Sequence, residues 1–391
     1  MRRAMDVVAV LILLFLVLWM FTRPQTRSAA PGFTAIPTQI PPTAAALAPI
    51  GAQPGGLSAA MQPVATVDPD IGKTLDAHLQ SLAAKGLFNG AVLVAYRGEL
   101  LLNKGYGMAN YELGVPATPQ TRFRLASVTK QFTAVGVLML AAQGKIAVQD
   151  SICKYLSDCP VAWQPVTVHH LLSHTSGVPN YTDFLDYADF EQTQATPQQI
   201  ISRFRDLPLS FAPGTSFYYG NSNYVLLGMI IEQVTGETYA DWMRVNIFQP
   251  LGMSDTGYDP GAGMPLSGTR GYVAPGKPAI PINTSTLFSA GGLYSTVGDL
   301  YIWDQALNTD TLLDAKWRTL MFTPVMQQFG YGWKISDDRG HRRIGHAGLM
   351  SGASTYIGRY PDDGLTVIVL SNQETVDAPG IAIYLAQLVM P

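Results

Sequence analysis

Charged residues are scarce in this sequence, and their scarcity excludes one broad class of partner. Lysine, arginine, aspartate and glutamate make up 14% of the 391 positions, and the formal net charge is −3. No basic patch of the kind that neutralises phosphates is expected, so nucleic acid is not an expected partner. The apolar share of 47% argues against a disordered scaffold. It suffices for the core of one large domain or of two closely packed subdomains.

Two common hydrolase motifs are also missing. The sequence contains no G-x-S-x-G pentapeptide, which argues against an α/β-hydrolase. His170 and His174 have helical i,i+4 spacing, but Leu171 stands where the zinc motif H-E-x-x-H requires glutamate. We therefore expect no catalytic metal and no cofactor. Both histidines are interpreted as structural residues beside the turn at 175–177.

Cysteine occurs only twice, as Cys153 and Cys159. Two thiols six positions apart can form a small-loop disulfide in an oxidising compartment. A metal site would need more ligands than this neighbourhood offers. The alternative is a pair of unpaired, partly buried thiols, and the sequence does not decide between the two.

The N-terminal segment predicts export from the cytoplasm. Arg2 and Arg3 precede an apolar run at 7–21, which is long for a signal-peptide core and slightly short for a membrane span. Small residues that could form a cleavage site come only at 28–30. We therefore expect residues 1–23 to be an uncleaved signal-anchor that attaches the protein to the membrane, with a cleaved signal peptide as the alternative. Both place the rest of the chain in the extracytoplasmic cell envelope.

The segment at 24–67 is rich in alanine and proline and predicts a flexible tether, because it cannot bury enough surface to offset its ordering entropy. The folded domain is expected at 68–391. Turn residues between apolar stretches predict a β-hairpin near each end of this domain, at 90–104 and 354–370. Helices are expected beside these hairpins, at 72–85 and 381–389.

The middle of the domain is expected to be mainly helical, at about 120–285. Thr196, Thr238 and Thr296 are each followed three residues later by a side chain that can close a helix N-terminus. The chain would start in a sheet, leave it to build a helical lobe, and return. The predicted class is α+β, with an antiparallel sheet flanked by helices and a mainly helical subdomain.

The pattern S-x-x-K occurs twice, in different surroundings. Such a pair is weak evidence alone, because ordinary residue frequencies predict about one or two matches in a chain of this length. Ser151 and Lys154 lie in a polar segment beside the cysteines, where the lysine is interpreted as a solvated surface charge. Lys130, by contrast, is the only charged residue from Ser127 to Gly144. The helix expected there is apolar on all sides, so it is expected to be buried.

Ser127 and Lys130 are the candidate nucleophile and base. Residues three apart share a helix face, so the amine can reach the hydroxyl. Burial disfavours the charged form of lysine and moves it toward accepting a proton near neutral pH. Ser127 would lie at a helix N-terminus, where free backbone N–H groups favour developing negative charge. On this pair alone, a lysine that extends from a core helix toward solvent is an equal alternative.

Two further stretches offer the remaining groups of an active site. Tyr219 and Asn221 follow a Pro-Gly turn on an irregular stretch before an apolar helix. A phenol can relay the serine proton to a leaving group, and an amide can bind a substrate carbonyl. His346 lies in a Gly-rich strand that a substrate could approach closely, and it offers a donor or a titratable charge. Each stretch alone has a structural alternative, a Tyr-rich loop over a core or a hydrogen-bonding histidine.

In this order and spacing, the three stretches resemble the serine β-lactamase and penicillin-binding-protein superfamily, specifically its class C-like branch. That group uses S-x-x-K on a helix, Y-x-N on a loop of a helical lobe, and K-T-G or H-x-G on a strand. The likeness runs from about Asp70 to the end of the chain. It implies a β-lactamase/transpeptidase-like fold. Longer similar stretches are 123–133, 170–177, 250–256, 290–296 and 369–372.

The resemblance implies acyl transfer through a covalent serine ester. Ser127 would attack a carbonyl, Lys130 and Tyr219 would share the base role, and water would then release the acyl group. The backbone N–H groups of Ser127 and Leu349 would form the oxyanion hole. The substrate-binding residues that it implies are Asn221, His346, Gly348 and Leu349.

His346 is the position where the sequence departs from the cephalosporinases of this branch, which carry a lysine there that serves the β-lactam carboxylate. Histidine is found in the relatives that resemble D-amino-acid peptidases and esterases. The predicted function is therefore hydrolysis of small D-amino-acid-type peptides, esters or related amides in the cell envelope. A class C-type β-lactamase and a sensor that binds cell-wall peptides or β-lactams without turnover are the alternatives. Loops at 179–194 and 258–284 are expected to shape the pocket, and they do not reveal the substrate or the oligomeric state.

Overall fold

The computed structural model describes residues 69–261 and 269–390. The predicted signal-anchor at 1–23 and tether at 24–67 lie outside the described residues. All described residues belong to one compact unit, Ala65–Pro391. Within this described part of the chain, no helix is both long enough and apolar enough to cross a membrane.

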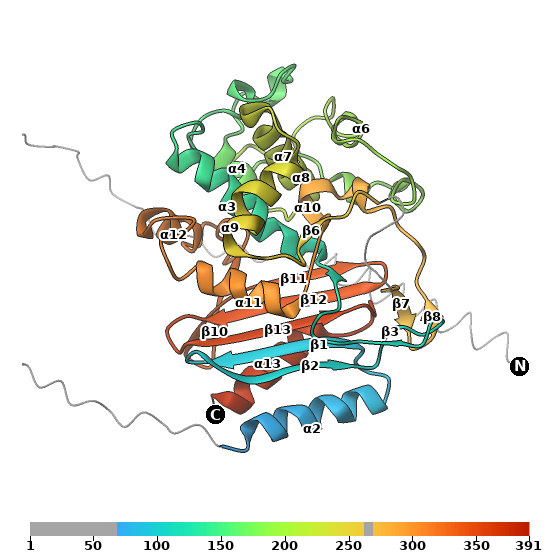
Figure 1. Ribbon diagram of the computed structural model, residues 1–391. Helices are drawn as coiled ribbons and strands as arrows, with labels where there is room; N and C mark the ends of the chain where they lie inside the picture. The colour runs from blue at the N-terminus through green and yellow to red at the C-terminus, as the bar shows by residue number, and fades with distance from the viewer. Residues whose placement is uncertain (1–68, 262–268, 391) are drawn as a thin grey trace, which may run out of the picture. The chain divides into compact units, whose positions relative to one another are not determined.

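A six-stranded antiparallel sheet forms the centre of this unit, in the order β10-β11-β12-β13-β1-β2 (Figure 1). Strand β1 pairs with β13, so that Leu93 lies opposite Ile368. The two predicted hairpins therefore share one sheet, as expected for a chain that leaves a sheet and returns to it. The strands of the sheet are β1 Gly90–Tyr96, β2 Glu99–Tyr106, β10 Lys334–Asp338, β11 His341–Met350, β12 Ala353–Tyr360 and β13 Leu365–Ser371.

In the described residues, three small sheets accompany the central one. Their orders are β3-β4, β5-β9-β6 and β7-β8. The strands of these sheets are β3 Met108–Asn110, β4 Val115–Pro116, β5 Phe123–Arg124, β6 Gly257–Tyr258, β7 Tyr272–Ala274, β8 Lys277–Pro278 and β9 Leu293–Ser295.

Helices surround the central sheet. The helices are α2 Ile71–Ala84, α3 Thr129–Ala142, α4 Val168–Leu172, α5 Tyr187–Phe190, α6 Pro197–Ser202, α7 Asn221–Thr235, α8 Tyr239–Met243, α9 Gln249–Leu251, α10 Phe288–Gly291, α11 Val297–Ala306, α12 Ala315–Met321 and α13 Ala378–Val389. Short helical turns lie at η1 Ala126–Val128, η2 Ile152–Lys154, η3 Val161–Trp163, η4 Tyr181–Asp183, η5 Arg244–Phe248 and η6 Thr284–Thr286.

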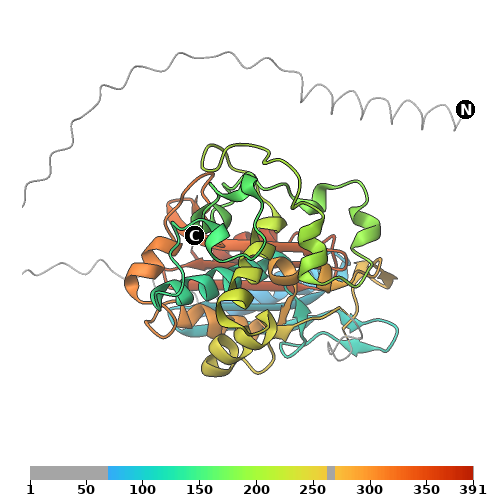
Figure 2. The same ribbon diagram turned by 90° about the horizontal axis from the view of Figure 1, so that it is seen from above.

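Both faces of the sheet are buried, because helices cover each of them. Val92 and Val94 belong to the apolar cluster that includes α2 and α13, whereas Ala91 and Leu93 belong to the larger cluster on the opposite face. Successive residues of a strand point to opposite faces, so β1 is apolar throughout rather than alternating. Figure 1 shows the lobe of α3, α4, α7 and α8 on the face opposite α2 and α13, and Figure 2 shows the green and yellow segments of this lobe in front of the sheet. The predicted fold class, α+β with a β-lactamase/transpeptidase-like arrangement, is confirmed.

The predicted helix starts in the lobe are confirmed, whereas the last helix starts earlier than predicted. The hydroxyls of Thr196, Thr238 and Thr296 each accept a hydrogen bond from the backbone N–H three residues on. Helix α13 begins at Ala378 rather than near 381. The Asp377 side chain accepts a hydrogen bond from the Gly380 N–H and caps it, and a proline in the first turn favours this earlier start.

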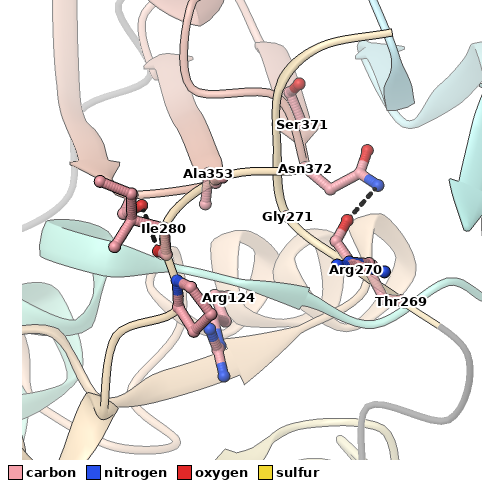
Figure 3. Close-up of a pocket in the computed structure, with 12 residues that line it drawn as sticks. Arg124, Thr269, Arg270, Gly271, Ile280, Ala353, Ser371 and Asn372 are labelled. Atoms are coloured by element: carbon pink, nitrogen blue, oxygen red, sulfur yellow. Dashed lines mark hydrogen bonds between the residues drawn. The ribbon is translucent and has the colours of Figure 1, made fainter. Parts of the chain in front are cut away.

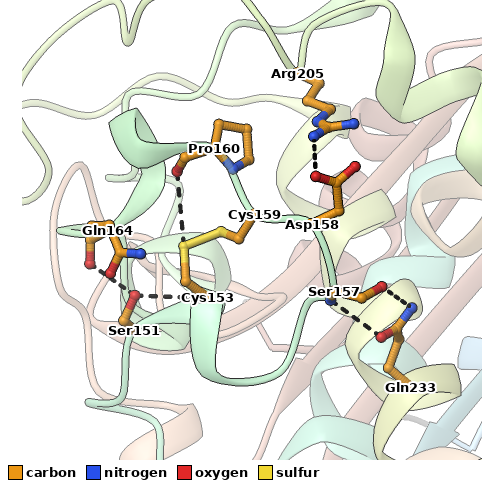
Figure 4. Close-up of a disulfide and its surroundings, with 9 residues drawn as sticks. All are labelled: Ser151, Cys153, Ser157, Asp158, Cys159, Pro160, Gln164, Arg205 and Gln233. Atoms are coloured by element: carbon orange, nitrogen blue, oxygen red, sulfur yellow. Dashed lines mark hydrogen bonds and ion pairs between the residues drawn. A yellow bond between two sulfur atoms is a disulfide. The ribbon is translucent and has the colours of Figure 1, made fainter.

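Cys153 and Cys159 form a disulfide, which decides between the two alternatives left open by the sequence (Figure 4). Their Cα atoms lie 5.2 Å apart. The loop that they close is tied to the helical lobe by an ion pair of 2.7 Å between Asp158 and Arg205. Disulfides persist in oxidising compartments, so this bond is consistent with the predicted export.

Candidate active site

Ser127 lies in the turn η1, immediately before helix α3. The turn is anchored on both sides. The Leu125 N–H donates to the Leu293 carbonyl over 2.8 Å, and the Thr355 hydroxyl donates to the Leu125 carbonyl over 2.8 Å. Residues 129–138 of α3 are all buried, which confirms the predicted buried helix. Ser127 itself is only partly buried, so its hydroxyl can be reached from outside.

Gly348 allows strand β11 to pass close to this turn. A Cβ atom at Gly348 would lie 2.2 Å from the Leu125 carbonyl oxygen and 2.4 Å from the Thr355 hydroxyl. Such distances are too short for any side chain, so the glycine is required by packing. The sequence predicted a close approach of substrate to this strand. At Gly348 the close approach is to the protein's own backbone.

Lys130 is completely buried, and three oxygen atoms surround its Nζ. The Nζ lies 3.0 Å from Ser127 Oγ and 2.7 Å from Asn221 Oδ1. The Ala290 carbonyl oxygen lies 2.8 Å away on a third side. The predicted alternative of a lysine extending toward solvent is therefore wrong, since Lys130 stays inside and contacts the serine.

Burial lowers the pKa of Lys130 well below its usual value, because desolvation disfavours the ammonium form. A neutral amine has two N–H donors and one lone pair. The Ala290 carbonyl and the Asn221 Oδ1 can only accept, so they take the two N–H groups. The lone pair is then left for the Ser127 hydroxyl. In this protonation state the geometry suits removal of the serine proton.

The Y-x-N stretch is held in place by a neighbouring loop. Asn221 is the first residue of α7, rather than part of the irregular stretch before it, and its N–H donates to Asn180 Oδ1 over 2.9 Å. The Gly220 N–H donates to His174 Nδ1 over 3.2 Å. The Asn221 side-chain amide also donates to the Thr182 hydroxyl over 3.1 Å, which orients its carbonyl oxygen toward Lys130.

Tyr219 lies against both Ser127 and Lys130. Its ring centroid is 5.0 Å from Lys130 Nζ. Burial raises the pKa of Tyr219, and a hydrogen bond with Ser127 only partly offsets that effect. The phenol therefore stays protonated near neutral pH, while burial favours the neutral amine of Lys130. The His174 ring packs on the phenol at a centroid distance of 4.5 Å.

The two histidines interpreted as structural have structural contacts. His170 accepts a hydrogen bond from the Thr167 N–H through its Nδ1 and completes the cap of helix α4. His174 is buried and accepts a hydrogen bond at the start of α7, so it supports the Y-x-N stretch from behind. In the described part of the chain, no group of three or more His, Cys, Asp or Glu side chains is arranged to hold a metal.

His346 lies on β11, is buried, and is neutral near neutral pH. Burial and the nearby Lys130 lower its pKa to about 3. Its Nδ1 is 2.6 Å from the Ala347 carbonyl oxygen, which can only accept, so Nδ1 carries the proton. The Nε2 atom is then an acceptor, and it is buried without a hydrogen-bond partner. The sequence predicted that His346 would offer a donor or a titratable charge. The buried Nε2 acceptor differs from that prediction, because the sequence could not show how deeply the ring is buried.

A pocket of about 300 Å³ opens beside Ser127. Asn221 and the exposed side chain of Leu349 also line it, so three predicted site residues meet at this pocket. The other four predicted residues do not line it: Lys130, Tyr219, His346 and Gly348. The loop predicted to shape the pocket at 179–194 contributes three residues that were not singled out. These residues are Thr182, Tyr187 and Glu191. Ile282 comes from the other predicted loop.

A second pocket, of about 190 Å³, has arginines but no paired nucleophile and base (Figure 3). Arg124 and Arg270 line it and already form ion pairs of 2.9 Å with Asp259 and 3.0 Å with Glu112. The Ser351 hydroxyl in this pocket donates to a backbone carbonyl. The pocket that contains Ser127 is therefore the candidate active site.

Comparison with known protein families assigns the chain to one of them. Residues 75–389 match the family model described as Beta-lactamase, and the chain belongs to that family. It is a serine hydrolase of the β-lactamase-related type, and its relatives include penicillin-binding proteins and a D-amino acid amidase.

Three relatives illustrate the similarity. The chain is 32% identical over 329 residues to penicillin-binding protein 4* of Bacillus subtilis (strain 168), covering 77% of this chain and 72% of that protein. It is 28% identical to the octameric penicillin-binding protein homologue from Pyrococcus abyssi, with a TM-score of 0.73 and 82% and 77% of the two chains covered. It is 26% identical to a D-amino acid amidase from Ochrobactrum anthropi SV3 complexed with L-phenylalanine, with a TM-score of 0.70 and 82% and 97% covered.

Proposed function

We propose that Ser127 is the nucleophile of an acyl-transfer hydrolase that cleaves D-amino-acid-type peptides, related amides or esters. The observation that carries this proposal is the environment of Lys130. Two obligatory acceptors occupy its N–H groups, and the remaining lone pair faces the Ser127 hydroxyl. Lys154, the lysine of the other S-x-x-K match, has no such surroundings, because it pairs with Asp150 at the surface.

The proposed reaction starts when Lys130 accepts the Ser127 proton and the serine oxygen bonds to the substrate carbonyl carbon. The backbone N–H groups of Ser127 and Leu349 would stabilise the oxyanion. Tyr219, kept protonated by burial, would donate its proton to the leaving amine or alkoxide and regain one from Lys130. Water would then attack the acyl-serine and regenerate the free serine.

The neutral state of His346 supports peptide, amide or ester substrates. A neutral ring provides no positive charge for the carboxylate of a β-lactam, whereas a lysine at this position would. The relation to penicillin-binding proteins and to a D-amino acid amidase supports the same substrate class. A class C-type β-lactamase and a binding protein without turnover remain as alternatives.

A substrate panel tests this proposal on the full-length protein. It contains D-Ala-terminated peptides, a chromogenic short ester, a cephalosporin and a fluorescent penicillin. We expect turnover of peptides or esters that depends on Ser127, and slow or stoichiometric labelling by the penicillin. Fast cephalosporin turnover would favour the β-lactamase alternative, and labelling with no turnover of any substrate would favour the sensor.

We further propose that the enzyme acts in the cell envelope, tethered by its N-terminal segment. The disulfide between Cys153 and Cys159 supports an oxidising location. Fractionation of cells that express the full chain, compared with cells that express a chain lacking residues 1–23, checks this. Activity in the membrane fraction that is lost on this deletion is expected, and equal distribution of both forms would contradict the anchor.

A further inference from the structure

The pocket beside Ser127 contains a single charged side chain. Of the residues that line it, Glu191 is the only one with a formal charge. Lys130 lies behind Ser127 and does not line the pocket, and burial favours its neutral form. The segment 262–268, for which no structure is described, contains no charged residue in its sequence. Among the described residues that line it, the pocket therefore has one negative charge and no positive charge.

Glu191 is held in position by its backbone, and no described residue places a positive charge on its carboxylate. Its N–H donates to the Tyr187 carbonyl over 2.8 Å, and its own carbonyl accepts from the Asn283 N–H over 2.7 Å. The Tyr187 phenol donates a hydrogen bond to the carboxylate. Among the described residues, none forms an ion pair with Glu191. Desolvation and the nearby Glu374 raise its pKa, and the hydrogen bond from Tyr187 offsets part of that rise.

An apolar wall lies in the same pocket. Ile282, Leu287 and Met350 line it, and each side chain is more than nine-tenths buried. A ligand that fits both features would combine an apolar body with a positive charge. An amine is the group that satisfies a carboxylate most directly, because an ammonium supplies both charge and N–H donors.

We propose that Glu191 binds an ammonium group on the acyl part of the substrate, so that the enzyme prefers substrates with a free amine to uncharged ones. The ammonium is either the α-amine of an N-terminal residue or an amine at the end of a side chain. This inference rests on the proposed function and narrows its substrate class. Glu191 acts in it as a specificity-determining residue and has no role in the bond-breaking steps.

Three p-nitroanilides test the proposal on the full-length protein. The D-phenylalanine compound has a free α-amine, N-acetyl-D-phenylalanine has no charge, and N-acetyl-D-lysine has only a side-chain amine. For wild type we expect a higher kcat/KM for at least one charged compound than for the neutral one. A preference for the D-phenylalanine compound would identify the bound amine as an α-amine. A preference for the N-acetyl-D-lysine compound would identify it as a side-chain amine.

The variant Glu191→Gln keeps the shape of the side chain and removes its charge. We expect the ratio of kcat/KM for the preferred charged compound to that for the neutral compound to fall about 10- to 100-fold, the range for a hydrogen bond to a charged group. The matched control is Glu237→Gln, an exposed glutamate beyond the C-terminal end of α7, for which the ratio should not change. A charge reversal, Glu191→Lys, should shift the preference toward an N-succinyl compound.

The outcomes separate failure of this inference from failure of the proposed function. A wild-type ratio near one, or a ratio that Glu191→Gln leaves unchanged, overturns the role of Glu191. Hydrolysis of the neutral compound that still depends on Ser127 leaves the proposed function intact in that case. Hydrolysis that Ser127→Ala does not reduce would overturn both.

Discussion

The two S-x-x-K segments of this chain share a pattern and differ in the physical properties that catalysis requires. Lys130 is completely buried against three oxygen atoms, whereas 64% of the Lys154 side chain is exposed and its amine pairs with Asp150 over 2.6 Å. Burial lowers the pKa of Lys130, and the hydrogen bond to Asp150 raises the pKa of Lys154. The spacing puts a lysine within reach of a serine, but only burial lowers the pKa of that lysine as the proposed base role requires.

The serines of the two segments also differ. Ser127 Oγ contacts a buried amine at the mouth of a pocket, whereas the Ser151 hydroxyl donates to the Gln164 carbonyl over 2.8 Å and caps the turn η2. The Ser127 hydroxyl contacts the proposed base beside a pocket, whereas the Ser151 hydroxyl has a local structural partner. Paired substitutions at matching positions therefore test whether the two segments differ in function as they differ in structure.

Replacing the serines should give the largest contrast. Ser127→Ala is expected to lower kcat/KM for a chromogenic ester by about 10³-fold or more, because the covalent route is lost. Ser151→Ala should leave the rate within about twofold, since it removes only a cap on a short surface turn. Initial rates at several ester concentrations measure both. Equal rates for the two variants would contradict the assignment of the nucleophile.

Replacing the lysines should give a smaller but still large contrast. Lys130→Met is expected to cost about 10²- to 10⁴-fold in kcat/KM, the usual contribution of a general base. Lys154→Met should have no measurable effect on the rate, because that side chain is exposed. Circular dichroism checks that Lys130→Met is folded, since it leaves the Asn221 and Ala290 oxygens without their donor.

The pH profile of wild type reports the same base. Only the neutral amine of Lys130 can accept a proton, so kcat/KM should rise with pH through an apparent pKa well below that of an ordinary lysine. The rate should then stay level up to about pH 10, because burial raises the pKa of Tyr219 and keeps its phenol protonated. A rise centred near the pKa of free lysine would contradict a desolvated Lys130.

The neighbouring tyrosines offer a third pair. Tyr219→Phe is expected to lower kcat about 10²-fold for an amide with a poor leaving group, because the leaving nitrogen then lacks its proton donor. The loss should be smaller for a nitrophenyl ester, whose leaving group needs no proton. Tyr218→Phe is the control, since Tyr218 is 52% exposed and donates to Asp183. Similar losses for both substrates with Tyr219→Phe would argue against proton donation.

The sequence predicted the parts of the fold and site that depend on local composition. Turn residues between apolar stretches located both hairpins, and threonine caps located three helix starts. Lys130 was distinguished from Lys154 because the residues around it are apolar, and that composition is what buries it. These features depend on neighbours in the sequence, so a single chain reveals them.

Other features depend on residues that are distant in the sequence and could not be predicted. The Ala290 carbonyl that contacts Lys130 is 160 positions away in the sequence. Every residue has a backbone carbonyl, so the residue type at 290 does not indicate this contact. In the sequence, nothing distinguishes Glu191 from the other polar residues of its predicted loop. The fold brings it into the pocket with Ser127. The protonation of His346 likewise follows from its burial beside the rings of Tyr219 and Phe329, which are distant in the sequence.

Removing the disulfide should have the smallest effect on activity, and it separates stability from catalysis in the second segment. The double variant Cys153→Ser, Cys159→Ser opens a loop whose ends are six positions apart, for which chain entropy predicts a loss of about 2 kcal/mol in the free energy of unfolding. Denaturant titration measures that loss. The rate with a chromogenic ester should not change, because none of the residues that contact Ser127 lies in this loop. A rate that falls together with stability would show that the Lys154 segment supports the active site, and the contrast between the two segments would then be one of degree.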